Sequence, residues 1–143
     1  MTELAANHQQ ILRRIPQRIN DMEVLLYLQR NQVNWEYVQT LKIATQFKDE
    51  LLSEWLNITT KTFRNYKKTD QEINISTKEH VLLLLSLMLH GQSVFGSIES
   101  FQTWLEEENF YFDNKSPKDY LNTITGIRFV DERLTALEYG DNV

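Results

Sequence analysis

Apolar residues recur at every third or fourth position along most of the chain, which is the spacing of one face of an α-helix. Only four glycines and two prolines occur among 143 residues, so the sequence predicts an all-α fold. The run VLLLLSLML at 81–89 is apolar on every side and predicts a buried central helix on which the others pack. We expect this helix to begin near residue 77, after a capping box of Ser76 and Glu79, and to end at Gly96.

Shorter helices are predicted on both sides of the central one. Upstream, Pro16 suits the first turn of a helix that buries Met22 and Leu26. Asn34 can cap the helix after that. Downstream, Ser97 can cap a short helix whose apolar residues return at helical spacing.

The stretch KDELLSEWLNITTKTFRNYKK, residues 48–68, meets the requirements of a helix-turn-helix. Such a motif needs a small residue in its first helix, a turn residue that tolerates positive φ, and apolar residues where the helices cross. Ser53 is the small residue, and Asn57 is among the few residues besides glycine that accept positive φ. Thr59 or Thr60 can cap the second helix. The apolar residues at the crossing are Leu52, Leu56, Ile58, Phe63 and Tyr66.

The second helix of this motif is basic and carries no acidic residue before Asp70. We expect it to contact DNA, because Arg reads guanine and Asn reads adenine in the major groove, while Lys suits phosphates. Since four basic residues are few for independent affinity, a homodimer on two half-sites about 34 Å apart would be needed. The alternative is a solvated basic face on a structural helix. The candidate DNA-binding residues are Thr60, Lys61, Arg64, Asn65, Lys67 and Lys68.

Two more helices are predicted at the C-terminal end. Ser116 can cap the first of them, with Pro117 at the first helical position, where a missing N–H is no loss. Thr123 or Thr125 can open the second. Gly126 costs about 1 kcal/mol of helix propensity there, so we expect another backbone to approach it closely. The last helix has an apolar stripe and a glycine terminator, in order Ile127, Val130, Leu134, Leu137 and Gly140.

Composition excludes several classes of site. The chain has no cysteine, so disulfides, thiolate zinc sites and Cys nucleophiles are absent, and a cytoplasmic location is expected. Its start has no signal-peptide pattern, and the run at 81–89 is too short to span a bilayer, so no membrane contact is expected. His8, His80 and His90 lack metal-ligand spacing, and no phosphate-cradling glycine loop occurs. We therefore expect neither an enzyme nor a metal or cofactor.

The net charge of −5 is concentrated in the C-terminal half. Residues 1–47 and 48–70 each carry five basic and four acidic residues, whereas residues 71–143 carry five basic and twelve acidic ones. A nucleic-acid backbone would repel such a half, and a basic protein partner would suit it. The alternative is that the acidic residues only keep the surface soluble.

The order of the motifs VFGS, ESFQTWL, NKSPKDYL and TITGIRFVDERLTALEYG resembles the toxin-binding domain of Xre/MbcA/ParS-like antitoxins. In that family a helix ending in VFG precedes a WL helix, a Thr-Pro helix start and a G-x-x-x-V helix with a Tyr-Gly or His-Gly tail. This chain departs in having Ser-Pro and a tail ending in DNV. The upstream helix-turn-helix is similar to the Xre-type half of the family. The domains expected are a partly flexible segment at 1–19, an Xre-like helix-turn-helix domain at 20–75 and a toxin-binding domain at 76–143.

The resemblance implies an antitoxin that neutralises a cognate RES-domain or ParT-like toxin, which consumes NAD or transfers ADP-ribose. It implies that the last helix and tail cover the toxin's NAD pocket, that a homodimer forms a higher-order complex with the toxin, and that the helix-turn-helix represses the chain's own operon. The alternative is a stand-alone dimeric helix-turn-helix transcriptional regulator with no toxin partner. The implied toxin-binding residues are Arg128, Asp131, Glu132, Thr135, Glu138, Tyr139, Asp141, Asn142 and Val143.

Overall fold

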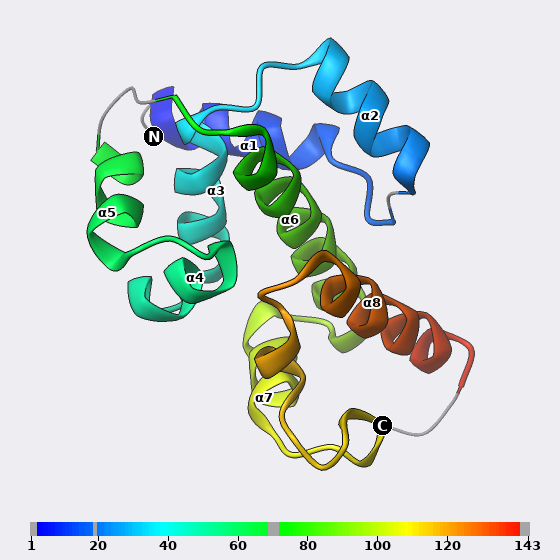
Figure 1. The fold of residues 1–143 in the computed structure, drawn as a ribbon. Coiled ribbons are helices and arrows are strands. Elements are labelled where there is room, and N and C mark those ends of the chain that lie inside the picture. Colours follow the sequence, from blue (N-terminus) through cyan, green and yellow to red (C-terminus); the bar gives the residue numbers. More distant parts are fainter. Residues whose placement is uncertain (1–2, 19, 69–71, 141–143) are drawn as a thin grey trace.

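A 21-residue helix, α6, forms the axis of the fold (Figure 1). The computed structural model describes residues 3–18, 20–68 and 72–140, and this part of the chain contains eight α-helices, two short 3₁₀ helices and no strand. The all-α prediction is therefore confirmed. The elements are α1 (Glu3–Arg14), α2 (Asp21–Arg30), α3 (Trp35–Thr45), α4 (Asp49–Leu56), α5 (Thr60–Lys68), α6 (Ile75–Phe95), α7 (Ile98–Glu106), η1 (Phe110–Phe112), η2 (Pro117–Tyr120) and α8 (Ile124–Glu138).

Helix α6 is central because it is apolar on all its sides. Every residue from 80 to 88 is buried, and α2, α3, α4, α7 and α8 all pack against this helix. Gly96 ends it in the left-handed conformation (φ 86°), as predicted. The predicted start is wrong: Asn74, not Ser76, caps the helix, and its side chain accepts a 2.8 Å hydrogen bond from the Thr77 N–H. An asparagine is as good a cap as a serine, and this one stands ahead of Ile75.

No single helix in the described ranges is long and apolar enough to cross a membrane. Only α6 and α7 taken together would meet that test by length and composition, and they are bent by 101° at their junction.

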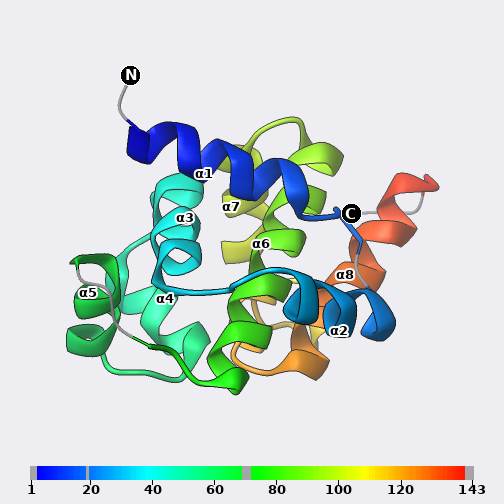
Figure 2. The ribbon, with the colours of Figure 1, turned by 90° about the horizontal axis from the view of Figure 1, so that it is seen from above.

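The N-terminal segment contains a helix, α1, that packs on α3. Helix α1 lies across α3 (Figure 2), where Ile11 and Ile15 are buried and the His8 Nδ1 is 2.6 Å from the Thr40 hydroxyl. Apolar burial and one buried hydrogen bond therefore join α1 to the rest of the bundle.

Helix α2 begins later and turns a different face inward than Pro16 suggested. Asn20 caps it and Glu23 completes a capping box, so the first helical residue is Asp21. With this start Val24 and Tyr27 are buried, whereas Met22 is 61% exposed. The capping box, which the sequence prediction overlooked, decided where the helix begins.

The predicted helix-turn-helix geometry is present in α4 and α5. Asn57 adopts the left-handed conformation at the turn (φ 58°), and Phe63 is fully buried at the crossing. The hydroxyls of Ser53 and Thr60 lie 3.2 Å apart across the crossing. Thr59 is the residue that caps α5, because its hydroxyl accepts a 3.0 Å hydrogen bond from the Thr62 N–H.

The Ser-Pro start produces a shorter element than predicted. Pro117 opens η2, a single turn of 3₁₀ helix, and the hydroxyl of Ser116 makes no cap. It donates instead to the carbonyl oxygen of Glu106 at 2.8 Å, tying the loop after α7 to the start of η2. Thr123 is the cap of α8, since its hydroxyl accepts a 2.9 Å hydrogen bond from the Gly126 N–H.

Gly126 lies where η2 crosses the first turn of α8. A Cβ placed on this residue would overlap the carbonyl oxygen of Tyr120 and lie 2.7 Å from its carbonyl carbon. Both neighbours are backbone atoms, so neither can move aside without shifting η2. The predicted close approach of another backbone is therefore confirmed.

Three side chains join the helix-turn-helix and α6 to the connection that leads into α8. The indole N–H of Trp55 donates to the Lys118 carbonyl at 3.0 Å, and the Asn57 amide donates to the Asn122 carbonyl at 2.8 Å. His80 Nε2 lies 2.9 Å from the carbonyl oxygen of Leu121. Burial lowers the pKa of His80 more than this hydrogen bond raises it, so the neutral ring donates through Nε2. The two halves thus share a hydrogen-bonded seam.

A buried histidine joins α6 to the far end of α8. His90 is 1% exposed, its Nδ1 is 2.6 Å from the Asp131 carboxylate, and its Nε2 pairs with the Glu138 carboxylate. Burial acts to lower the pKa of His90, but the hydrogen bonds and charges of the two carboxylates raise it, and the net direction is upward. The imidazolium form satisfies both carboxylates, because each ring nitrogen then donates a hydrogen.

Replacing Gly126 with alanine should destabilise the fold even though alanine is the better helix former. The added methyl meets the Tyr120 backbone, and we expect a loss of at least about 2 kcal/mol in the free energy of unfolding, measured by urea denaturation. Thr125→Ala in the same turn is the control and should change it by less than about 0.5 kcal/mol. Equal stability of the Gly126→Ala chain and the wild type would contradict the close approach.

Stability should fall as the pH rises from about 6.5 through the raised pKa of His90. In that range the folded state binds a proton that the unfolded state has released, so raising the pH favours unfolding. The free energy of unfolding measured between pH 6.5 and 9 should fall less steeply in an Asp131→Asn, Glu138→Gln double variant. Glu132→Gln, which removes a carboxylate of the same helix away from His90, should keep the wild-type slope.

Candidate functional site

The side of α8 turned away from α6 carries four of the predicted contact residues. Arg128, Glu132, Thr135 and Tyr139 are spaced by four, three and four residues, so they lie along one side of the helix. We call these four residues the outer face of α8. Tyr139, just past the end of the helix, is 82% exposed. This face is therefore an accessible strip with an aromatic ring at its end.

Two residues of the outer face have partners within the fold. The Arg128 guanidinium pairs with the Asp21 carboxylate at the start of α2, although both side chains are more than half exposed. The Thr135 hydroxyl donates to the carbonyl oxygen of Asp131 at 3.1 Å. Glu132 and Tyr139 make no side-chain hydrogen bond or ion pair with another described residue, which leaves them available to a partner.

Two of the other predicted contact residues pair with a buried histidine, although their side chains remain 30% and 37% exposed. Asp131 and Glu138 are seven residues apart, so both lie on the side of α8 that meets α6, where they hold His90. The sequence suggested that these carboxylates point outward, because no local signal announces a buried histidine on another helix. The last three predicted residues, Asp141, Asn142 and Val143, lie outside the described residues.

A second accessible surface, missed by the sequence analysis, lies on the other side of α8. Tyr111 is 42% exposed and Phe129 is 43% exposed, and Phe110 at the tip of the loop is 80% exposed. The guanidinium carbon of Arg133 lies 3.5 Å from the centroid of the Tyr111 ring. We call Phe110, Tyr111, Phe129 and Arg133 the aromatic surface. The sequence indicates this surface only through Phe129, an aromatic residue that lies off the apolar stripe of the last helix.

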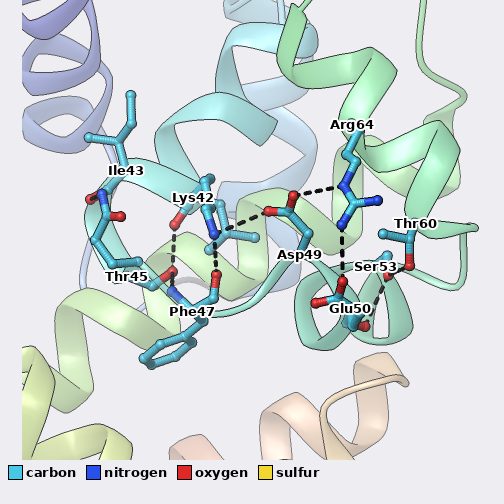
Figure 3. Close-up of polar contacts among 11 residues, drawn as sticks. Lys42, Ile43, Thr45, Phe47, Asp49, Glu50, Ser53, Thr60 and Arg64 are labelled. Atoms are coloured by element: carbon cyan, nitrogen blue, oxygen red, sulfur yellow. Dashed lines mark hydrogen bonds and ion pairs between the residues drawn. The ribbon is translucent and has the colours of Figure 1, made fainter.

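The basic face of the helix-turn-helix is partly neutralised by its own first helix. The Arg64 Nε is 3.1 Å from the Asp49 carboxylate, and its Nη2 is 3.0 Å from that of Glu50 (Figure 3). Lys42 of α3 approaches the same Asp49 carboxylate at 3.1 Å and donates to the Phe47 carbonyl. Since the Arg64 side chain is still 50% exposed, its guanidinium is oriented by these acids and remains at the surface.

The remaining DNA-binding candidates are all placed on α5. Lys61 and Asn65 are exposed, whereas Thr60 is partly buried and faces Ser53. Lys67 and Lys68 belong to the last turn of α5, and their side chains lie outside the described part of the chain. The face that a DNA groove could meet therefore consists of Lys61, Arg64 and Asn65 within the described residues.

In the described ranges, no group of three or more His, Asp or Glu side chains is arranged to hold a metal ion. The cluster around His90 illustrates the reason. Its two carboxylates occupy opposite ring nitrogens, so the three groups do not converge on one point as metal ligands must.

The comparison with curated proteins finds no match for this chain. A family model does match residues 90–140, and it describes the antitoxin Xre/MbcA/ParS C-terminal toxin-binding domain. The matched segment includes the end of α6, both 3₁₀ helices, α7 and α8, so it contains the outer face of α8 and the aromatic surface. The match is to a binding domain, it confirms the resemblance in this part of the chain, and it supports an antitoxin role with a toxin as partner. Residues 90–140 are thus similar to the C-terminal toxin-binding domains of Xre/MbcA/ParS antitoxins.

Proposed function

We propose that the chain is the antitoxin of a type II toxin–antitoxin module whose toxin is of the RES-domain or ParT-like class. The outer face of α8, with the tail after Gly140, covers the toxin's NAD pocket. The observation that carries the proposal is the exposure of Glu132 and Tyr139 inside a segment that matches a toxin-binding domain. Both side chains point away from the core that the rest of α8 helps to form.

The charge of this face fits such a target. A pocket that receives the phosphates of NAD needs Arg or Lys side chains, and a carboxylate can occupy the same place with charge-assisted hydrogen bonds. Glu132 offers that carboxylate in the described part of α8, and Asp141 would add a second in the tail. Tyr139 supplies an aromatic anchor beside them, a residue type enriched where binding energy concentrates.

Asp131 and Glu138 support toxin binding indirectly in this proposal. Their ion pairs with His90 hold the last turns of α8 against α6, and so fix where Tyr139 is displayed. A fixed orientation lowers the entropy lost on binding. These two carboxylates therefore act as positioning residues, and their exposed parts stay accessible to the toxin.

Glu132→Arg combined with Tyr139→Ala should weaken neutralisation. The change removes the aromatic anchor and sets a positive charge against the basic pocket, so we expect affinity for the toxin encoded beside this gene to fall about tenfold or more. Growth on co-expression and calorimetric titration of the purified pair measure it. Glu54→Arg, the same charge reversal at an exposed position of α4, is the matched control and should still rescue growth.

A chain ending at Gly140 tests the tail separately from the helix. Shortening the chain further, to Gly126, would remove the buried Ile127, Val130 and Leu134, so a lost rescue would then report unfolding. If both the double variant and the chain ending at Gly140 bind as tightly as the wild type, the covering of the pocket by this end of α8 is refuted.

The second half of the proposal is repression of the operon by α5 of a homodimer. The proposal is supported by the exposure of Lys61 and Asn65 and by Arg64, whose half-exposed guanidinium is oriented by Asp49 and Glu50. The alternative, a stand-alone dimeric regulator, would use the same helix without a toxin. The two functions differ in the neighbouring gene, which encodes a RES-like or ParT-like toxin only if the chain is an antitoxin.

Lys61→Ala with Arg64→Ala should weaken binding to DNA from the promoter of the operon and leave toxin neutralisation unchanged. If each of the two lost cations contacts a phosphate, the slope of log affinity against log salt concentration should become shallower by about two. Fluorescence anisotropy at several salt concentrations measures this slope. Arg13→Ala with Arg18→Ala removes the same charge from exposed positions of the N-terminal segment and is the control. Equal DNA affinity in the two double variants would exclude α5 as the reading helix.

A further inference from the structure

We propose that the aromatic surface is a second contact surface for the toxin, separate from the outer face of α8. It comprises Phe110, Tyr111, Phe129 and Arg133, and it lies on the other side of the helix. The inference rests on the proposed function, because it takes the same toxin as its occupant. It adds a contact outside the NAD pocket, in which an apolar hollow on the toxin receives these rings.

The exposure of these rings is the first argument. A single exposed apolar residue needs no explanation, but neighbouring exposed aromatic rings mark an interaction site. Phe110 and Tyr111 meet edge to face with centroids 5.7 Å apart, and Phe129 meets the buried Phe112 with centroids 5.1 Å apart. Phe129 is thus continuous with the aromatic core of the C-terminal domain, and Phe110 and Tyr111 form a second pair of rings.

The second argument is that the loop presenting Phe110 is held in one shape. The Asn109 side chain accepts a hydrogen bond from the Tyr111 N–H, its backbone N–H donates to the Lys115 carbonyl, and its carbonyl accepts from the Asn114 N–H, all at 3.0 Å. The Ser116 hydroxyl closes the loop onto Glu106. A loop fixed in this way cannot fold Phe110 inward, so the ring stays in water until a partner covers it. Its ordering has already occurred, which lowers the entropy lost on binding.

The third argument is chemical. Arg133 is 9% exposed, and its guanidinium carbon lies 3.5 Å from the centroid of the Tyr111 ring. The inner face of this ring therefore packs on a cation. Tyrosine and phenylalanine are enriched at protein–protein interfaces, and the strongest contacts often involve tyrosine. The same residues would be poor ligands for a nucleic-acid backbone, given the acidic residues beside them.

Charge selects the occupant. Glu106, Glu107 and Glu108 precede the loop, Asp113 lies within it, and all four are exposed. In a symmetric dimer each copy would press this acidic rim against its own equivalent, which costs free energy. A partner with an apolar hollow and a basic rim avoids that repulsion. Because residues 90–140 match a toxin-binding domain, the toxin is the partner that this chemistry fits.

Phe110→Ala in the full-length chain tests the proposal against the purified toxin of the adjacent gene. We expect calorimetric affinity to fall about tenfold or more, and Phe110→Trp to restore most of it. The thermal midpoint should stay at the wild-type value, because the ring is 80% exposed. Ile75→Ala is the matched control: its side chain is 61% exposed and lies at the start of α6, outside the matched segment.

Three outcomes would overturn the inference. An unchanged toxin affinity in Phe110→Ala, with loss in the Glu132 and Tyr139 double variant, refutes the aromatic surface and leaves the proposed function intact. A smaller mass by light scattering of free Phe110→Ala, with unchanged toxin affinity, assigns the surface to a second copy of the chain. Absence of any binding by the wild-type chain refutes both the proposed function and the inference built on it.

Discussion

The burial of α6 on all its sides is the constraint on which the other helices depend. A helix apolar all round must be enclosed, and α2, α3, α4, α7 and α8 enclose this one. Helix α8 contributes Ile127, Val130 and Leu134 to that enclosure, and this fixes its rotation. Because the apolar stripe of α8 faces α6, the outer face and the aromatic surface lie on the two exposed sides of this helix. The candidate binding surfaces are therefore consequences of how the core is closed.

Two contacts at opposite ends of α8 hold it in that position. At its start, Gly126 allows the Tyr120 carbonyl to approach more closely than any side chain would permit. At its end, His90 joins Asp131 and Glu138 to α6. A helix held at both ends presents its exposed side chains rigidly, which suits a binding element that must not lose much entropy on contact. The seam from Trp55 and Asn57 to the residues before α8 extends this rigidity to the helix-turn-helix.

Local patterns predicted much of the fold because they act within a few residues. The central helix, its end at Gly96, the turn at Asn57 and the cap at Thr123 all follow from the chemistry of one residue and its neighbours. Errors arose where two local signals competed: Asn74 prevailed over Ser76, and the capping box at Asn20 prevailed over Pro16. The Ser116 hydroxyl donates to the carbonyl oxygen of Glu106 at the end of α7, and therefore does not cap the following helix as expected.

By itself, the sequence determined the helical class, the apolar core of α6 and α8, the helix-turn-helix and the resemblance to a toxin-binding domain. These features depend on periodicity, caps and motif order, which are properties of residues close together in the sequence. Tertiary structure alone decided which polar residues of α8 pair with the rest of the fold. Asp131 and Glu138 are sequence neighbours of Glu132 and Tyr139, yet they pair with a histidine more than forty residues away. Likewise, Phe110 is exposed because its loop is closed by contacts on both sides. The physical reason is that the contacts of a side chain depend on which distant residues pack opposite it, and neighbouring residues in the sequence do not determine that.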